Sequence, residues 1–313
     1  NSLKPKYNGV SNFIVKLRLL LNRSNPLRLL IFLPSGPLLK DTLLVGLWRS
    51  QSVQLEHTSS LERREFKYLI SNEVADAMVD YLKGICTLDP HAQRDGFYPI
   101  RSLYLDSNQF QLYHANQRED QKRFKARVRS YPRGKGSVWF EIKQRSGDTI
   151  HKTRASVPEE LWQHLLQEPH AFRPSDFDNR SAGLIERFLW HYHSYHLRPT
   201  MLVEYDRVAY ISQLDDYARV TFDRHIRCQT QEELSIDAPD WKWRVVDHPK
   251  RVYALEPLCV LELKFGAIVP RWMAVFVQNF EIIRYSFSKY CYSVDAQHVL
   301  PHSHVAGIQA RRL

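Results

Sequence analysis

The stretch RFKARVRSYPRG, residues 123–134, places a Lys or an Arg at four consecutive odd positions. Small or apolar residues stand between these cations, at Phe124, Ala126, Val128 and Ser130. Because successive side chains of a β-strand point to opposite faces, this alternation predicts a strand with one cationic face and one apolar face. The apolar face suits packing against helices, and the cationic face requires a separate explanation.

The same alternation recurs along the chain. The polar positions of the other predicted strands are Glu65/Lys67, Glu141/Lys143, Lys152/Arg154, Tyr205/Arg207, Arg219/Thr221/Asp223 and Glu262/Lys264. A solvent-facing sheet, whose cations pair with acids on neighbouring strands, would account for any one of these strands. Such a face tolerates Ser, Thr and Gln equally well, so the repetition of Lys and Arg on many strands favours an enclosed face.

An enclosed cationic face implies a ligand. A closed sheet of about eight strands has an interior that holds side chains or one elongated ligand. Lysines and arginines gathered there repel one another unless a polyanion occupies the interior, and guanidinium groups bind phosphate oxygens bidentately. The few acids cannot neutralise the cations, but Glu262 in particular could hold a divalent metal that bridges phosphates.

The charge distribution indicates a local cationic site rather than a cationic exterior. The 313 residues carry a formal net charge of +10. Residues 1–58 have eight Lys or Arg against two acids, and residues 294–313 have two against one, which leaves +3 for residues 59–293. This near balance, and the lack of an aromatic and basic repeat in the sequence, argue against a nucleic-acid-binding protein.

Predicted strands predominate, with a few helices between them, which is typical of an α+β domain with a mostly antiparallel sheet. Ser71 is predicted as the N-cap of a helix that runs to about Leu82. Pro158 is expected in the first turn of a second helix. Further helices are expected over Ala182–Tyr195 and over residues 269–280.

We place one domain at residues 59–293, between a leader at residues 1–58 and a tail at residues 294–313. The leader is Leu-rich, basic and irregular, and we interpret it as a disordered or non-native extension. A short amphipathic helix that contacts a membrane or a partner is the alternative. Its longest uncharged run has 11 residues, fewer than the roughly 20 of a membrane span, so no transmembrane segment is expected. The four widely spaced cysteines form no CxxC pair, which favours a reducing, cytoplasmic location.

Nine short segments, in chain order, carry a family resemblance: RREFKYLI, IRSLYLD, RFKARVRSY, WFEIKQR, HKTRASV, VEYDRVAY, ARVTFDRHI, VLELKF and SKY. Together they resemble the VTC domain, the polyphosphate polymerase domain of the vacuolar transporter chaperone family, which also occurs in stand-alone bacterial proteins. The resemblance covers residues 61–292. It implies the CYTH-like triphosphate tunnel fold, an eight-stranded antiparallel β-barrel with flanking helices. It also implies transfer of the γ-phosphate of ATP onto inorganic polyphosphate, with Mn²⁺ or Mg²⁺ as cofactor.

The resemblance also implies a set of site residues. The cations that match the family's phosphate-binding positions, the first four of them expected to be catalytic, are Arg127, Arg129, Arg207, Lys289, Lys67, Lys143, Lys152 and Arg219. Tyr205 and Ser288 are expected to add hydroxyl groups to substrate binding, and Glu262 matches the metal-binding acid of the LEXK strand.

One departure bears on the reaction. The related adenylate cyclase and thiamine triphosphatase branch of the fold has an ExExK first strand, whereas this chain has RREFK at residues 63–67. Arginine in place of the first glutamate counts against a strongly acidic two-metal hydrolase and favours a binder of long phosphate chains. Two alternatives remain open: a triphosphate or polyphosphate hydrolase of the same fold, and a non-catalytic polyphosphate-binding module. The sequence does not determine the oligomeric state.

Overall fold

The computed structural model describes residues 64–92, 96–134, 136–147, 149–215, 217–249 and 258–297. The predicted leader, residues 1–58, lies outside the described residues, as do residues 298–313 of the predicted tail. The last described helix continues to Gln297, past residue 293, where the sequence placed the end of the domain. Among the described residues, no helix is both long enough and apolar enough to cross a bilayer.

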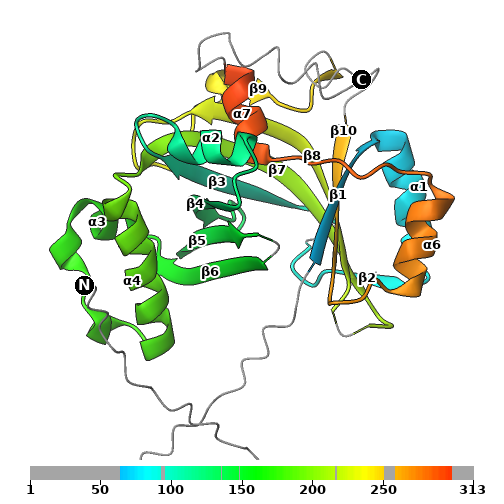
Figure 1. The fold of residues 1–313 in the computed structure, drawn as a ribbon, viewed down its shortest axis with the longest axis horizontal. Helices are drawn as coiled ribbons and strands as arrows, with labels where there is room; N and C mark the ends of the chain where they lie inside the picture. The colour runs from blue at the N-terminus through cyan, green and yellow to red at the C-terminus, as the bar shows by residue number, and fades with distance from the viewer. Residues whose placement is uncertain are drawn as a thin grey trace, which may run out of the picture. The chain divides into compact units, whose positions relative to one another are not determined.

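One antiparallel sheet organises the fold (Figure 1), and its main path runs β1-β10-β8-β7-β3-β4-β5-β6. Two short strands join it at the side, β2 on β7 and β9 on β8. The strands are β1 (Arg64–Ser71), β2 (Cys86–Leu88), β3 (Tyr98–Asp106), β4 (Lys122–Ser130), β5 (Ser137–Ser146), β6 (Thr149–Pro158), β7 (Arg198–Ser212), β8 (Arg219–Thr230), β9 (Arg244–Val245) and β10 (Leu258–Phe265).

Helices flank the sheet on both faces. They are α1 (Asn72–Leu82), α2 (Gln111–Gln117), α3 (Trp162–Gln167), α4 (Asn179–Ser194), α6 (Arg271–Asn279) and α7 (Lys289–Gln297), with short 3-10 helices η1 (Pro169–Ala171), η2 (Pro174–Asp176) and η3 (Asp240–Lys242). The expected α+β class, with an antiparallel sheet and flanking helices, is thereby confirmed.

The sheet curls but does not close into a barrel among the described residues. The strands β1 and β6 stand at opposite ends of the strand order. Curvature still brings the two ends close, because Lys143 Nζ on β5 donates to both carboxylate oxygens of Glu65 on β1, at 3.1 and 3.2 Å. The free edge of β1 contacts the segment before α7 instead, where Tyr285 N–H donates to the Lys67 carbonyl at 2.9 Å. The expected closed barrel is therefore corrected to an open, curled sheet.

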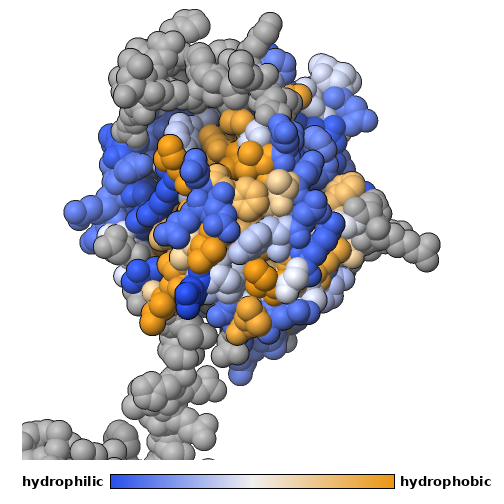
Figure 2. Space-filling view, turned by 90° about the vertical axis from the view of Figure 1, so that its right-hand side faces the viewer, coloured by the Kyte–Doolittle hydropathy of each residue, from blue (hydrophilic) through white to orange (hydrophobic). Residues whose placement is uncertain are grey.

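One outer layer covers β1, β10 and β8. Helices α1 and α6 pack there through Met78, Leu82, Met273 and Phe276, all fully buried. Helix α1 begins as predicted, because the Ser71 hydroxyl accepts a hydrogen bond from Val74 N–H at 3.1 Å. Figure 2 shows the outward side of this part of the molecule, where polar and apolar side chains are interspersed.

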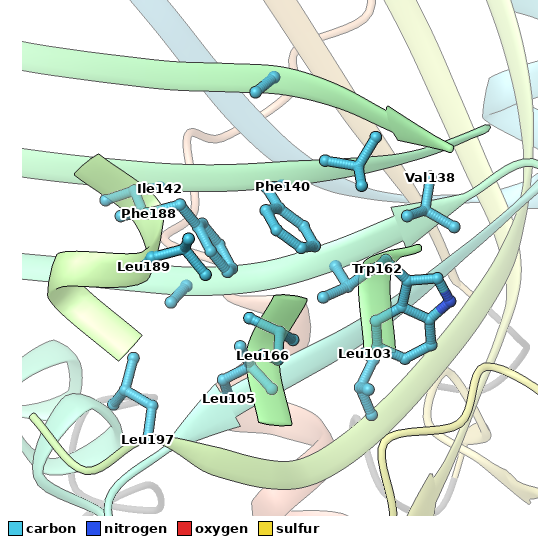
Figure 3. Packing of buried hydrophobic residues seen from close by; sticks show 14 of the residues in the cluster. Leu103, Leu105, Val138, Phe140, Ile142, Trp162, Leu166, Phe188, Leu189 and Leu197 are labelled. Atoms are coloured by element: carbon cyan, nitrogen blue, oxygen red, sulfur yellow. The ribbon is translucent and has the colours of Figure 1, made fainter. Parts of the chain in front are cut away.

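A second outer layer, formed by α3 and α4, covers β4, β5 and β6. The even positions of the opening stretch, Phe124, Ala126 and Val128, join this core as the alternation predicts. The rings of Phe140 on β5 and Phe188 on α4 stack at 4.3 Å between centroids (Figure 3).

The helix predicted from Pro158 forms, but its predicted start was wrong. Strand β6 extends to Pro158, which pairs with Ser137, and the following helix begins at Trp162. A proline at the end of an edge strand removes no hydrogen bond that the sheet requires. The buried pair Val157 and Val138 continues the strand up to that point.

Candidate functional site

The concave side of the sheet is here called the inner face. One end of it is apolar, and the rest of its surface carries charged side chains. At the apolar end, Tyr290, Cys291 and Val294 of α7 pack against Met201 and Val203 of β7, among others. Lys289, at the start of α7, points from this packing toward the charged remainder and is only 6% exposed. The inner face is therefore closed by α7 at one end, and its charged side chains lie beyond.

A first group of charges surrounds Glu262 of β10. The cations whose nitrogens lie within 3.4 Å of its carboxylate oxygens come from four elements: Lys264 at 2.8 Å, Arg207 at 3.3 Å, Lys289 at 3.3 Å and Lys67 at 3.4 Å. Asp223 of β8, fully buried, takes a bidentate fork from Arg207 at 2.6 and 2.7 Å and the Lys289 ammonium at 2.5 Å. We call these six residues the Glu262 cluster.

Burial alone would raise the pKa of Glu262, but the four surrounding cations outweigh it and hold that pKa well below its usual range. Burial likewise opposes the charge on Lys289, yet Asp223 and Glu262 raise the pKa of its ammonium. The aromatic face of Tyr205 adds to this, since the Lys289 ammonium lies 4.6 Å and the Arg207 guanidinium 5.4 Å from its ring centroid. Glu262 and Lys289 are thus both charged near neutral pH.

A second group surrounds Glu141 of β5, which is 2% exposed. Its cations come from β4 and β6: Arg127 at 2.6 Å, Lys152 at 3.3 Å, Arg154 at 3.3 Å and Arg129 at 3.7 Å. We call these five residues the Glu141 cluster. One buried carboxylate cannot neutralise four cations, so this cluster carries a formal surplus of positive charge.

Two of these arginines approach Glu141 through Nε as ion pairs without hydrogen-bond geometry. In the described part of the chain, the buried Nε atoms of Arg129 and Arg154 make no hydrogen bond. The Arg154 guanidinium stacks on Trp139 at 3.9 Å, which fixes its plane. Buried donors without partners are costly, and an anionic ligand with several acceptor oxygens would satisfy them. The arrangement is therefore suited to an anion with several acceptor oxygens.

The structure brings most of the predicted site residues onto the inner face. Those in the two clusters are Lys67, Arg127, Arg129, Lys152, Arg207, Glu262 and Lys289, with Tyr205 directly beneath two of the cations. Lys143 lies apart and pairs with Glu65. Their roles in catalysis and in binding remain predictions.

Two predicted residues have partners of their own. Arg219 forms an ion pair with the buried carboxylate of Asp89, and donates to the Tyr98 hydroxyl at 3.2 Å. The Ser288 hydroxyl accepts from Cys291 N–H at 3.3 Å, as an N-cap of α7 does. Ser288 also lines a pocket described below. A phosphate would compete with these contacts.

The predicted site omitted several residues of the inner face. Glu141, Asp223, Lys264 and Arg154 share the alternation of the chosen residues, so the sequence held a signal for them. Their importance depends on which strands are neighbours, because Glu141 collects cations from β4 and β6 on either side of β5. Strand order is not visible in the sequence of a single strand.

A pocket of about 200 Å³ opens beside the Glu262 cluster and shares Lys67 with it. Of the described residues that line it, six are Lys or Arg and two are acidic: Lys67, Arg123, Lys125, Lys143, Arg145 and Arg284 against Glu65 and Glu119. Burial lowers the pKa of the Lys125 ammonium to about 8, and Lys67, Lys143 and Arg123 act in the same direction. The pocket is thus strongly cationic.

The carboxylates fit a divalent metal only in part. Mg²⁺ and Mn²⁺ prefer oxygen ligands, and enzymes often hold Mg²⁺ with one or two carboxylates plus the phosphates of a substrate. Among the described residues there is no group of three or more His, Cys, Asp or Glu that could hold a metal ion. Glu262 and Asp223 lie close together but are already paired with cations. The donor set therefore fits a metal that arrives with phosphate ligands.

Comparisons with known proteins identify the family of this chain. Residues 62–298 match the family profile of the VTC domain. The chain is 25% identical over 226 residues to vacuolar transporter chaperone complex subunit 4 of Trypanosoma brucei brucei, covering 63% of this chain and 28% of that protein. It is 26% identical over 221 residues to subunit 2 of Schizosaccharomyces pombe, covering 61% and 30%. The chain thus spans less than a third of the length of these curated relatives.

Solved structures with a similar course include a putative adenylate cyclase from Bacillus halodurans, at a TM-score of 0.39 and 15% identity over 72% of this chain and 94% of that one. Another is a putative adenylate cyclase from Vibrio parahaemolyticus, at a TM-score of 0.38 and 11% identity over 74% and 97%. These likenesses are loose. The match to the family profile covers most of the chain, and this protein belongs to the VTC domain family.

Proposed function

We propose that this domain synthesises inorganic polyphosphate by transferring the γ-phosphoryl group of ATP onto the end of a growing chain. The observation that carries the proposal is the convergence of cations from five strands and α7 on a few buried carboxylates of the inner face. A surface with this excess of guanidinium and ammonium groups is suited to a ligand with many phosphate charges. Membership of the VTC domain family supports the same ligand.

The proposed reaction needs no nucleophile from the protein. A terminal oxygen of the polyphosphate attacks the γ-phosphorus, and the bond from that phosphorus to the β,γ-bridging oxygen breaks to release ADP. The transition state is loose and metaphosphate-like, so catalysis consists of positioning and neutralisation of charge. We assign these tasks to Arg127, Arg129, Arg207 and Lys289.

The carboxylates hold these cations in place before the substrate arrives. Arg127 donates through Nε to Glu141 at 2.7 Å and through one terminal nitrogen to the Tyr104 hydroxyl at 3.0 Å. Its planar fork is therefore oriented in advance, which lowers the entropic cost of binding a phosphate. A Mg²⁺ or Mn²⁺ at Glu262 and Asp223 would neutralise charge on the phosphate oxygens.

The test is incubation of the purified chain with ATP and Mn²⁺, with chain length read on a gel. Long polyphosphate together with ADP is the expected product. Arg127→Ala should lower the rate by about 10²–10³, as for other lost contacts to developing charge. Arg187→Ala, at an exposed position of α4, should leave the rate unchanged.

Two outcomes would replace the proposal. Orthophosphate as the product, without longer chains, would identify a hydrolase of the same fold. Tight binding of polyphosphate with no turnover under Mn²⁺ would identify a binding module. Wild-type chain growth by both Arg127→Ala and Glu262→Ala would refute the assigned mechanism.

A further inference from the structure

The cationic pocket beside the Glu262 cluster differs from both clusters in one respect. Within the clusters every cation lies near a buried carboxylate. In the pocket, the Lys125 ammonium forms neither a hydrogen bond nor an ion pair with any residue that the structure describes. It is half-buried between β1, β4 and β5, and its charged neighbours on β1 and β5 include Lys67 and Lys143.

A lysine held among like charges without a counter-ion has an energetic cost that a bound anion removes. The two carboxylates of the pocket do not meet this need. Glu65 is engaged by Lys143 at 3.1 Å and Lys67 at 3.5 Å, and Glu119 is exposed. An anionic ligand in the pocket would supply the counter-charge that Lys125 lacks among the described residues.

We propose that Lys125 and its pocket form a second phosphate-binding position. It binds a part of the polyphosphate chain that is distant from the reacting phosphates. This inference rests on the proposed function. The pocket adjoins the Glu262 cluster through Lys67, which lines the one and contacts the carboxylate of the other. A chain bound at the reacting position can thus continue into the pocket without leaving the cationic surface.

The spacing along β4 selects for ligand length. Lys125, Arg127 and Arg129 point to the same face, and a strand rises about 3.3 Å per residue. The backbone positions of Lys125 and Arg129 are therefore about 13 Å apart, and Arg129 is turned toward Glu141, so an extended ligand is favoured to contact both side chains. A chain of many phosphates meets this requirement, and a single phosphate group does not. Lys125 would accordingly determine preference for long chains rather than the chemistry of transfer.

The lining favours phosphate over a nucleotide base. Ser286 and Ser288 supply hydroxyl groups beside the six cations, and the apolar residues of the lining are few: Ile150 and Phe287. A base would need a flat apolar or aromatic surface of its own size. Among the described residues of the lining, Tyr285 and Phe287 are aromatic, so ATP is the alternative occupant that the experiment must distinguish.

The test measures binding to long-chain polyphosphate, tripolyphosphate and ATP by calorimetry, without metal so that no turnover occurs. Lys125→Gln should weaken binding of the long chain about tenfold, the effect of one lost charge-assisted contact. Its effect on tripolyphosphate and on ATP should stay within about twofold. Lys125→Arg should retain long-chain affinity. Lys122→Gln, which alters an exposed lysine of the same strand, is the matched control and should bind as the wild type does.

Equal weakening for all three ligands would place Lys125 at the reacting phosphates and overturn the proposal, and so would unchanged long-chain binding. A selective loss of ATP binding would assign the pocket to the nucleotide and also overturn it. Failure of the proposed function can be distinguished from failure of this subsite. If Lys125→Gln selectively weakens long-chain binding but the wild type makes no polymer, the subsite stands and the polymerase does not.

Discussion

At the scale of single residues, the inner face holds its lysines in two electrostatic states. Asp223 and Glu262 overcome the effect of burial on Lys289 and raise its pKa. Burial prevails at Lys125 and Lys152, and it lowers the pKa of each to about 8, although Glu141 opposes the shift at Lys152. Burial also lowers the pKa of Lys143. The charges of Lys125 and Lys152, whose pKa values are about 8, therefore depend on pH near the physiological range.

This difference predicts pH-dependent binding. The titratable and charged groups around Lys125 are Glu65 and Lys67 on β1, Arg123 on β4, Lys143 and Arg145 on β5, Glu119 after α2, Arg284 and Tyr285 before α7, and Cys291 on α7. Bound phosphates stabilise the ammonium and raise its pKa, so binding takes up a proton at about pH 8. The affinity of the wild type for polyphosphate should therefore fall as pH rises from about 7 to about 9.

Lys125→Arg separates this effect from a general one, because arginine stays charged throughout that range. The variant should show a shallower fall in affinity, with the remainder due to Lys152 and Lys143. Calorimetry in two buffers of different ionisation enthalpy would report the proton uptake directly. Identical pH profiles for the variant and the wild type would contradict the assignment to Lys125.

Glu141 carries the second prediction at this scale, because a single carboxylate holds four cations together. Glu141→Gln keeps the shape of the side chain but leaves those cations with an uncompensated charge. Breaking a buried ion pair in this way costs about 3–5 kcal/mol, so the free energy of unfolding should fall by that amount. Polyphosphate should restore more stability to the variant than to the wild type, since it supplies the missing negative charge.

Thermal unfolding with and without tripolyphosphate measures both effects. Glu186→Gln, at an exposed position of α4, is the matched control and should change neither. A Glu141→Gln protein as stable as the wild type, with no larger response to tripolyphosphate, would show that the cations do not depend on this carboxylate.

At the scale of elements, the signals that predicted correctly are local. The alternation of residues 123–130 gave β4 with its buried and cationic faces, and Ser71 marked the start of α1. Pro158 gave a wrong helix start, because a proline suits either the first turn of a helix or the end of an edge strand. Which applies depends on pairing with Ser137, a contact that residues 158–167 do not reveal.

The sequence could not predict the open edge of the sheet or the full set of charged residues on the inner face, and the reason is the same for both. Both depend on which strands lie side by side and on the segment before α7, whose Tyr285 contacts the edge of β1. The positions of Lys67, Arg127 and Lys289 followed from the family resemblance, whereas the central place of Glu141 required the strand order β4-β5-β6. Long-range pairing is thus the part that sequence patterns leave undetermined.

The N-cap of α1 gives a prediction for a single element. Ser71→Ala removes the acceptor of the Val74 N–H and should lower the free energy of unfolding by about 1 kcal/mol. Ser71→Asn retains a capping oxygen and should cost only a few tenths of that amount. Chemical denaturation of the two variants measures the difference. Equal stabilities would show that packing of Met78 and Leu82 alone determines where the helix begins.

At the scale of the whole molecule, the cations of the two clusters and of the pocket lie on the concave side of the sheet. Three apolar cores of the described chain support that side from the outer face and from α7. Long-range repulsion among those cations opposes folding. A polyanion that fits the inner face therefore binds the folded state far better than the unfolded chain, and it should stabilise the fold by mass action.

This yields a prediction that separates an inner site from a cationic surface. At about 100 times its Kd, tripolyphosphate or a longer chain should add about 2.7 kcal/mol, which raises Tm by about 5–10 °C for a domain of this size. A single-stranded oligonucleotide with the same number of phosphates should add much less, because its bases and sugars do not fit between side chains spaced along one strand. Differential scanning calorimetry at matched phosphate concentration and ionic strength makes the comparison. The contrary outcome is an oligonucleotide that stabilises the protein as strongly as polyphosphate and loses its effect equally with added salt. The cations would then act as an exposed electrostatic surface, and the inner face would select no particular polyanion.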